Sequence, residues 1–182
     1  MSVAESGPGK GEFATVDRDE QFRSEFLRNM RAVPGPVAIV ATANGAERSG
    51  LTATAWNSLS ADPPMLLACI NRKASAHDII RRAGAFSVNL LPGGSHELVA
   101  TFAGKRGLSG AERFAPDLWH DGPSGQPMLV NAVAAFECQL EGVHDYGSHA
   151  ILVGRVGEMR NRCEGQALLY VDGSFASALR EG

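Results

Sequence analysis

The feature that most constrains the fold is a series of short β-rich runs with few helical segments between them. Val37–Ala43 (VAIVATA) ends at Asn44-Gly45, a dipeptide typical of two-residue hairpin turns, and Gly50–Ser60 is expected to return antiparallel to it. Because the runs show little strand–helix–strand alternation, they predict a mainly β, antiparallel barrel instead of a doubly wound sheet. The later runs interpreted as strands are Met65–Asn71, Ala85–Leu91, Ala132–Val143, His149–Met159 and Ala167–Asp172.

A few short helices are predicted at the periphery of this barrel. In the segment Ser75–Ala83, Ser75 and Asp78 have the spacing of a capping box, and Gly84 is a natural helix stop. Helical spacing or capping also predicts helices at Asp19–Met30, Ser95–Ala103 and, briefly, Ser109–Glu112. Residues 115–128 are rich in proline and glycine and are expected to form an ordered loop.

The composition is typical of one globular domain. The chain has 182 residues, 44% of them apolar, and a formal net charge of −3. We expect a flexible tail at 1–16, a domain at 17–182 and no nucleic-acid-binding surface. No apolar run is long enough to span a membrane, the first residues lack the apolar core of a signal peptide, and the three cysteines form no disulfide or zinc pattern. These features predict a cytoplasmic protein without membrane contact, with Cys69 and Cys138 as small core residues.

Several common catalytic motifs are missing from the sequence. No GxGxxG follows a strand, and neither GxxxxGK[ST] nor GxSxG is present. The histidines and carboxylates do not have the spacing of metal ligands. A nucleotide ligand would therefore not be held in the usual α/β manner, and hydrolase or metalloenzyme functions receive no support.

The stretch Gly50–Pro64 (GLTATAWNSLSADPP) gathers small and hydroxyl-bearing residues around one tryptophan. Its alternation fits an amphipathic strand with threonine and serine on the wet face, which spacing alone slightly favours. The second interpretation is a ligand edge, whose hydroxyls and backbone groups hydrogen-bond the rim of a flat heterocycle. Small residues such as Ala53 and Ala55 would let such a ring approach closely.

Two further positions have both a structural and a functional interpretation. Asn71–Ser75 ends a strand and opens a helix, so it is either a basic loop with an ordinary cap or a phosphate seat. In the seat, Arg72, Lys73 and the free N–H groups of the helix would bind the anion. His149 opens a strand after a Gly-Ser pair; it lies on the surface, the commoner situation for a lone histidine, or faces the mouth of a pocket.

Six segments in order resemble the flavin reductase-like family, which has an FMN-binding split barrel. Its members include the small NAD(P)H:flavin reductase components of two-component monooxygenases. The resemblance covers roughly Gln21 to Leu179, and Phe102–Phe114 is most similar to pyrimidine-catabolism and hydroxyphenylacetate-type reductases; a corrinoid reductase of the same fold has a similar segment. Each segment is weakly specific, whereas six in the right order are strong. The segments are FLRNMRAVPGPVAIV, GLTATAWNSLSADPP, MLLACINRKAS, AFSVNLL, TFAGKRGLSGAERF and GSHAILVGRV.

The resemblance implies an antiparallel split β-barrel with a few short peripheral helices, and it implies a set of site residues. The flavin ring would be lined by residues of the GLTA stretch, namely Thr52, Ala53, Thr54, Ala55 and Trp56, with Asn57 and Ser58 nearby. The phosphate would be held at the strand end and helix start, by Asn71, Arg72, Ser75 and Ala76. Asn89 and Lys105 would be further cofactor contacts, and His149 would lie near the nicotinamide as the catalytic residue. No metal is implied.

The implied activity is NAD(P)H-dependent reduction of FMN or FAD by hydride transfer. The reduced flavin would diffuse to a partner monooxygenase, and the flavin clefts would lie between the subunits of a homodimer. Alternatives are a reductase of the same fold with another acceptor, such as a corrinoid, and a non-catalytic flavin-binding module. The chain departs from the family's pattern at Ser148, where many relatives have Asp or Thr, at Trp56, where a small residue is common, and at Asp172–Ala176 (DGSFA), where relatives often have Tyr and His.

Overall fold

The computed structural model describes residues 18–161 and 165–178, so the tail predicted at 1–16 lies outside the described residues. Two compact units divide the chain, Met1–Val33 and Pro34–Gly182. The first unit contains helix α1 (Arg18–Arg31), which has acidic residues in its first turn and arginines in its last. Such charges stabilise a helix through its dipole. The helix predicted at this place is therefore confirmed.

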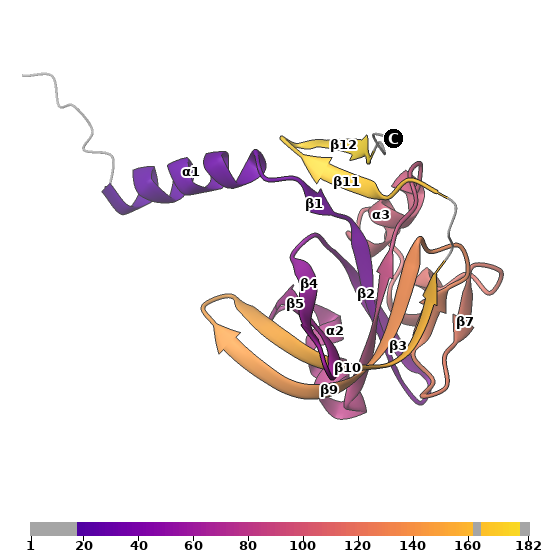
Figure 1. Ribbon diagram of the computed structural model, residues 1–182. Helices are drawn as coiled ribbons and strands as arrows, with labels where there is room; N and C mark the ends of the chain where they lie inside the picture. The colour runs from indigo at the N-terminus through magenta and orange to yellow at the C-terminus, as the bar shows by residue number, and fades with distance from the viewer. Residues whose placement is uncertain (1–17, 162–164, 179–182) are drawn as a thin grey trace, which may run out of the picture. The chain divides into compact units, whose positions relative to one another are not determined.

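The second unit is built around one antiparallel sheet of seven strands (Figure 1). The outer strands β3 and β4 form its two edges, so the sheet curves without closing into a barrel. The predicted mainly β, antiparallel fold is confirmed. In spatial order the strands are β3 (Glu47–Ala53), β2 (Ala38–Asn44), β6 (Ala85–Leu90), β9 (Ala134–Tyr146), β10 (His149–Asn161), β5 (Pro64–Asn71) and β4 (Trp56–Ala61).

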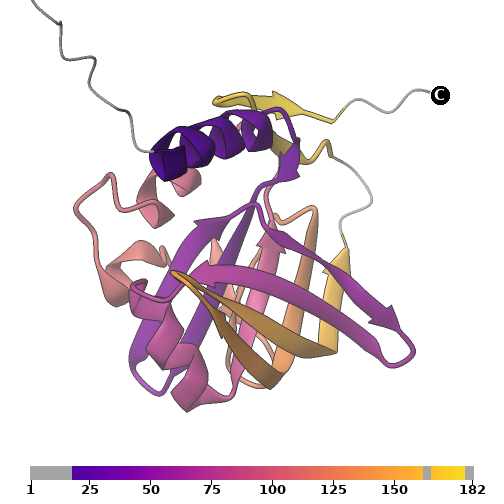
Figure 2. The same cartoon turned by 90° about the vertical axis from the view of Figure 1, so that its left-hand side faces the viewer.

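Smaller elements surround this sheet. Strands β1 (Gly35–Pro36), β11 (Leu168–Val171) and β12 (Ser174–Ser177) form a three-stranded sheet, and β7 (Trp119–Asp121) pairs with β8 (Pro127–Leu129). The helices are α2 (Ser75–Ala83), α3 (His96–Phe102) and the 3-10 helix η1 (Gly110–Arg113), all three of which contact β3 (Figure 2). The edge that β3 forms is thus flanked by helices. None of the described helices is long and apolar enough to cross a membrane.

The environment of strand β2 explains why its sequence is almost continuously apolar. Ile39 and Ala41 belong to one buried cluster, whereas Ala38 and Val40 belong to another, so both faces of the strand are buried. The hairpin to β3 turns at Gly45 and Ala46, one residue later than the predicted Asn44-Gly45, because Asn44 still pairs with Glu47; Gly45 has a φ of 61°. Glycine adopts this left-handed conformation without steric cost. The predicted hairpin is confirmed.

The described cysteines differ in burial. Cys138 is fully buried in the second core cluster, and burial, with the neighbouring Glu137 carboxylate, raises the pKa of its thiol to about 12. Cys69 is half-buried and belongs to neither cluster. The prediction of a core position is confirmed for Cys138 only, and Cys163 lies outside the described residues.

Two predicted elements are corrected by the strand pairing. The segment Gly50–Ser60 forms two strands instead of one, because β3 pairs with β2 at one edge of the sheet whereas β4 pairs with β5 at the other. The break falls at Thr54 and Ala55. The segment 115–128, predicted as a loop, contains strands β7 and β8, which pair through Trp119 and Leu129 at one end.

Of the two predicted helix capping boxes, at the starts of α2 and η1, only the second is present. Ala74, not Ser75, is the N-cap residue of α2, and the Ser75 hydroxyl lies 2.8 Å from the Ser49 hydroxyl instead of capping the helix. The box predicted at Ser109 and Glu112 is present with both of its hydrogen bonds. Ser75 therefore joins the start of α2 to strand β3.

Candidate functional site

Three segments meet where strand β5 ends: the start of α2, the strand end itself and the tip of the β9–β10 hairpin. His149 is the register partner of Asn71. The Arg72 backbone N–H donates to the Ser148 carbonyl at 3.0 Å, and its guanidinium donates to the Gly147 carbonyl at 3.2 Å. The sheet pairing thus brings together two segments that are more than seventy residues apart in the sequence.

An open pocket of about 420 Å³ lies at this junction. We call it the α2 pocket, and it is lined by Arg72, Lys73, His77, Asp78, Gly147 and Ser148. The first N–H groups of a helix have no acceptor within the helix, so the start of α2 offers donors and a positive dipole end to an anion. The Asn71 side chain shapes the entry to the helix by accepting a hydrogen bond from the Lys73 N–H at 2.9 Å.

Acidic groups lie in the α2 pocket and beside it. Asp145 Oδ2 lies 3.6 Å from Arg72 Nε, and Asp78 Oδ1 lies 2.8 Å from His77 Nδ1. The His77 side chain is buried, and its Nε2 atom has no hydrogen-bond partner. No local pattern in the sequence assigned His77 or Asp145 to a site, because these two side chains approach each other from different segments of the chain.

The connection between β3 and β4 is the second part of the site. Thr54 and Ala55 are exposed, whereas Ala53 is buried in the second core cluster. The Thr52 hydroxyl donates to the Val99 carbonyl of α3 at 3.3 Å, and the Ala55 carbonyl accepts from the Cys69 N–H at 2.8 Å. The connection is thereby fixed to α3 on one side and to β5 on the other.

The two parts of the site lie along the same strand. The Ala55 carbonyl accepts a backbone hydrogen bond from Cys69 of β5, and Asn71 lies two residues further along that strand. Since residues alternate between the faces of a strand, Cys69 and Asn71 share one face, about 7 Å apart. His149 pairs with Asn71 on this face. The polar connection and the α2 pocket therefore both adjoin the last residues of β5.

Beyond the strand break, Asn57 and Ser58 are exposed on the edge strand β4. The Asn57 side chain accepts a hydrogen bond from the Ser58 N–H at 2.8 Å. Both residues lie next to the exposed connection, as their predicted role requires. In α2, Ser75 is exposed whereas the Ala76 side chain is fully buried in the second core cluster, so Ala76 can offer a ligand only its backbone.

The side chains of Trp56 and Asn89, two of the predicted cofactor contacts, have partners within the protein. The Trp56 indole packs against the second core cluster and donates to the Pro36 carbonyl at 3.0 Å. Asn89 is fully buried; its amide nitrogen donates to the carbonyl of Ile39, and its oxygen accepts from the Leu129 N–H at 2.8 Å. Both side chains are bonded within the protein, and their assignment as cofactor contacts stays a prediction.

Lys105 follows α3 in an exposed turn whose preceding residue, Gly104, has a φ of 75°. This segment is joined to β3 by two contacts. The Arg113 guanidinium donates to the Gly50 carbonyl at 3.3 Å, and a Cβ at Gly50 would come within 2.9 Å of the Phe102 ring. The glycine thus permits close packing of α3 on the strand, which places the Lys105 turn beside β3.

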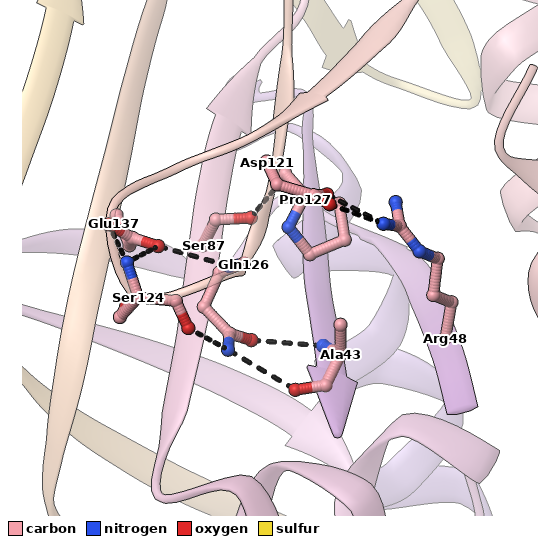
Figure 3. A network of polar contacts seen from close by, with 8 residues as sticks. All are labelled: Ala43, Arg48, Ser87, Asp121, Ser124, Gln126, Pro127 and Glu137. Atoms are coloured by element: carbon pink, nitrogen blue, oxygen red, sulfur yellow. Dashed lines mark hydrogen bonds and ion pairs between the residues drawn. The ribbon is translucent and has the colours of Figure 1, made fainter. Parts of the chain in front are cut away.

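A buried polar network holds the hairpin of β7 and β8 on the sheet (Figure 3). We call Thr42, Gln126 and Glu137, with the loop backbone they bind, the loop network. The Glu137 carboxylate accepts hydrogen bonds from the N–H groups of Ser124 and Gln126, at 3.1 and 3.0 Å, and the Gln126 amide bonds both backbone groups of Ala43. This network was not predicted, because its partners are distant in the sequence.

Comparison with known proteins shows the family. A family model described as the flavin reductase like domain matches residues 30–179. An FMN reductase (NADH), RutF, of Stutzerimonas stutzeri (strain A1501) is 35% identical over 164 residues, covering 87% of this chain and 93% of that protein. The 4-hydroxyphenylacetate 3-monooxygenase reductase component of Salmonella typhi is 32% identical over 157 residues, covering 86% and 92%.

Solved structures agree with this result. An NADH:FAD oxidoreductase of Streptomyces globisporus C-1027 superposes with a TM-score of 0.81 and 26% identity, covering 92% of this chain and 98% of that chain. The fold is thus that of flavin-dependent oxidoreductases with a split antiparallel sheet. The chain belongs to the flavin reductase-like family.

Proposed function

We propose that this chain is an NADH-dependent flavin reductase that supplies reduced flavin to a partner monooxygenase. One observation carries the proposal: the exposed polar connection between β3 and β4 and the α2 pocket lie next to each other at the end of β5. A flat heterocycle with an attached phosphate needs such a pair of surfaces, one with alternating donors and acceptors and one with free helix N–H groups.

In this proposal the flavin ring lies against Thr52–Ala55, with Asn57 and Ser58 at its rim. Thr54 and Ala55 are exposed and can present backbone and hydroxyl groups to the ring. The connection packs closely against β1, because a Cβ atom added at Gly35 would lie 2.8 Å from Thr54 Cβ. A preorganised edge of this kind suits a rigid, planar ligand.

The phosphate of the flavin is proposed to bind in the α2 pocket. Arg72 supplies a guanidinium and Ser75 a hydroxyl, while the N–H groups of Ser75 and Ala76 belong to the first turn of α2, where they lack helical acceptors. Asn71 orders the turn through its bond to Lys73. Lys105 is proposed as a more distant cationic contact from the turn beside β3.

The flavin supplies the redox chemistry, since it accepts a hydride from the nicotinamide of the reduced pyridine nucleotide. The chain's own residues bind and orient the two rings, and hydride transfer demands no general base from them. We propose that His149 positions the nicotinamide. It is exposed beside Asn71, and its Nδ1 atom lies 2.9 Å from the Ser148 hydroxyl, a contact that restrains the imidazole.

NADH and FMN are proposed as the preferred substrates. Several relatives are named FMN reductase (NADH), which supports this choice. The Streptomyces protein has also been solved in complex with NAD and FAD fragments, so FAD is included as an alternative flavin, and NADPH as an alternative donor.

The proposed assembly is a homodimer. Leu67, Cys69, Ile151 and Val153 form two register pairs on β5 and β10, are half-buried, and belong to neither core cluster. This apolar face adjoins Asn71 and His149, so a second subunit seated on it would border the flavin site. In the first unit, helix α1 by itself exposes the apolar side chains of Phe22, Phe26, Leu27 and Met30, which a second subunit could also bury.

The reductase is proposed to act in the cytoplasm, since Cys69 and Cys138 are free thiols of the kind kept in reducing compartments. The partner monooxygenase would receive the reduced flavin by diffusion. A relative is the reductase component of such a two-component system, which supports this arrangement.

The proposal is tested by purifying the chain, titrating it with FMN and FAD, and following NADH and NADPH oxidation with each flavin. We expect FMN-dependent NADH oxidation whose product reduces an added electron acceptor. Flavin binding without NAD(P)H oxidation would instead identify a non-catalytic flavin-binding module. Turnover only with a corrinoid would assign another acceptor, and a chain that binds no flavin would refute the proposal.

A further inference from the structure

Arg72, the cation proposed to bind the flavin phosphate, already has protein partners. Its Nε atom lies 3.6 Å from Asp145 Oδ2, and its guanidinium donates to the Gly147 carbonyl at 3.2 Å. The Arg72 and Asp145 side chains are 47% and 39% exposed, so both are accessible to a ligand. A phosphate that enters the α2 pocket must therefore compete with Asp145 for this guanidinium.

The fixed charges around the α2 pocket balance one another. Arg72 and Lys73 contribute two positive charges, whereas Asp78 and Asp145 contribute two negative charges. An excess of cationic donors would hold a phosphate more firmly, because charge-assisted hydrogen bonds are roughly twice as strong as neutral ones. These four side chains therefore give the surroundings of the pocket no excess of positive charge.

The position of Asp145 is set by the hairpin. Asp145 pairs with Ala150, whose side chain is fully buried in the second core cluster, so it lies on the side of the ribbon that faces α2. Its Oδ1 atom is 4.0 Å from His77 Nε2, a buried atom without a hydrogen-bond partner. The carboxylate therefore lies between Arg72 and His77, beside the α2 pocket.

We propose that Asp145 limits the affinity of the α2 pocket for the flavin phosphate by holding Arg72, so that the flavin is released as a product and is not retained as a prosthetic group. This inference rests on the proposed function. In this inference the Asp145 carboxylate promotes the release of flavin because it competes with the flavin phosphate for the Arg72 guanidinium.

The test is Asp145→Asn, measured by titration with FMN and with riboflavin, which lacks the phosphate. The substitution keeps the size of the side chain and removes its charge. We expect the Kd for FMN to fall about fivefold, the effect typical of one exposed charge pair, and FMN to dissociate more slowly. The Kd for riboflavin is expected to stay unchanged.

Two further variants make the test specific. Glu141→Gln removes the same charge from the same hairpin, where Glu141 pairs with Arg155 at 2.5 Å outside the α2 pocket, and it should leave both Kd values unchanged. In an Arg72→Ala background, Asp145→Asn should have little effect on the Kd for FMN, because the guanidinium for which Asp145 and the phosphate compete is absent.

The inference is overturned if Asp145→Asn leaves the FMN affinity unchanged or weakens it while wild-type protein binds both flavins and oxidises NADH. It is also overturned if Glu141→Gln tightens FMN binding equally, since the effect would then come from net charge. A wild-type chain that binds neither flavin would refute the proposed function itself, a result that is readily distinguished from the other two.

Discussion

The α2 pocket and the loop network are both polar clusters on the same sheet, yet their hydrogen bonding differs. In the loop network, Glu137 and Gln126 are buried, and each side chain bonds several backbone groups of the protein. In the α2 pocket, Arg72 and Lys73 are exposed, and the buried Nε2 atom of His77 has no partner.

This difference separates structural support from a binding surface. Buried polar groups that are fully hydrogen-bonded specify one conformation and leave nothing for a ligand to satisfy. A cluster with free donors and balanced charges can exchange its partners for those of a ligand. Substitutions in the loop network should therefore act on stability, and substitutions around the α2 pocket should act on flavin.

The largest effect is expected for Glu137→Ala in the loop network. The change leaves the N–H groups of Ser124 and Gln126 buried without their carboxylate, so the free energy of unfolding should fall by about 3 kcal/mol. Urea unfolding followed by circular dichroism measures it. Glu141→Ala, on the exposed face of the same strand, is the matched control and should change stability by less than about 0.5 kcal/mol. Equal losses for both would abolish the distinction between the two clusters.

Arg72→Ala tests the other side of the comparison. Losing a charge-assisted contact should raise the Kd for FMN about 30-fold and leave riboflavin binding nearly unchanged, because only FMN carries the phosphate. The unfolding free energy should stay within about 0.5 kcal/mol of wild type, since the side chain is exposed. Equal losses of affinity for FMN and riboflavin would count against a phosphate seat.

His149→Ala should affect catalysis more than binding. Flavin reduction in single-turnover experiments is expected to slow about tenfold, because the nicotinamide loses a residue that orients it, while the Kd for flavin changes little. Stopped-flow absorbance of the flavin measures the first quantity and titration the second. His120→Ala, in strand β7 away from this surface, serves as a control for the loss of an imidazole. Unchanged reduction rates in the His149 variant would remove the positioning role.

The sequence predicted most of the main sheet because its signals are local. The apolar run before Asn44-Gly45 and the turn itself define the β2–β3 hairpin without reference to any other segment. The break at Thr54 could not be predicted, since it depends on β4 joining β5 at the opposite edge of the sheet. The same holds for Asn89, whose amide is taken by the backbone of Ile39 and Leu129.

The candidate site shows the same limit. Arg72 and Ser75 were predicted from a strand end followed by a helix start, a local pattern with a physical reason for binding anions. Asp145 was not assigned to this site, because it reaches Arg72 only through the pairing of β10 with both β5 and β9. Residues that tune a site from another strand leave no local pattern in one sequence.

The smallest effect is expected for Arg82→Ala, which removes an exposed ion pair belonging to neither cluster. Arg82 donates to Glu47 at 2.7 Å, and the two side chains are 50% and 57% exposed. Water and salt screen such a pair, so the unfolding free energy should fall by at most about 0.5 kcal/mol, and by less at 1 M than at 0.1 M salt. Urea unfolding at the two salt concentrations measures it. A loss of unfolding free energy above about 1 kcal/mol that does not depend on salt would contradict the prediction. It would mean that an exposed polar contact can stabilise the fold as much as a buried one, and the comparison of the two clusters would then fail.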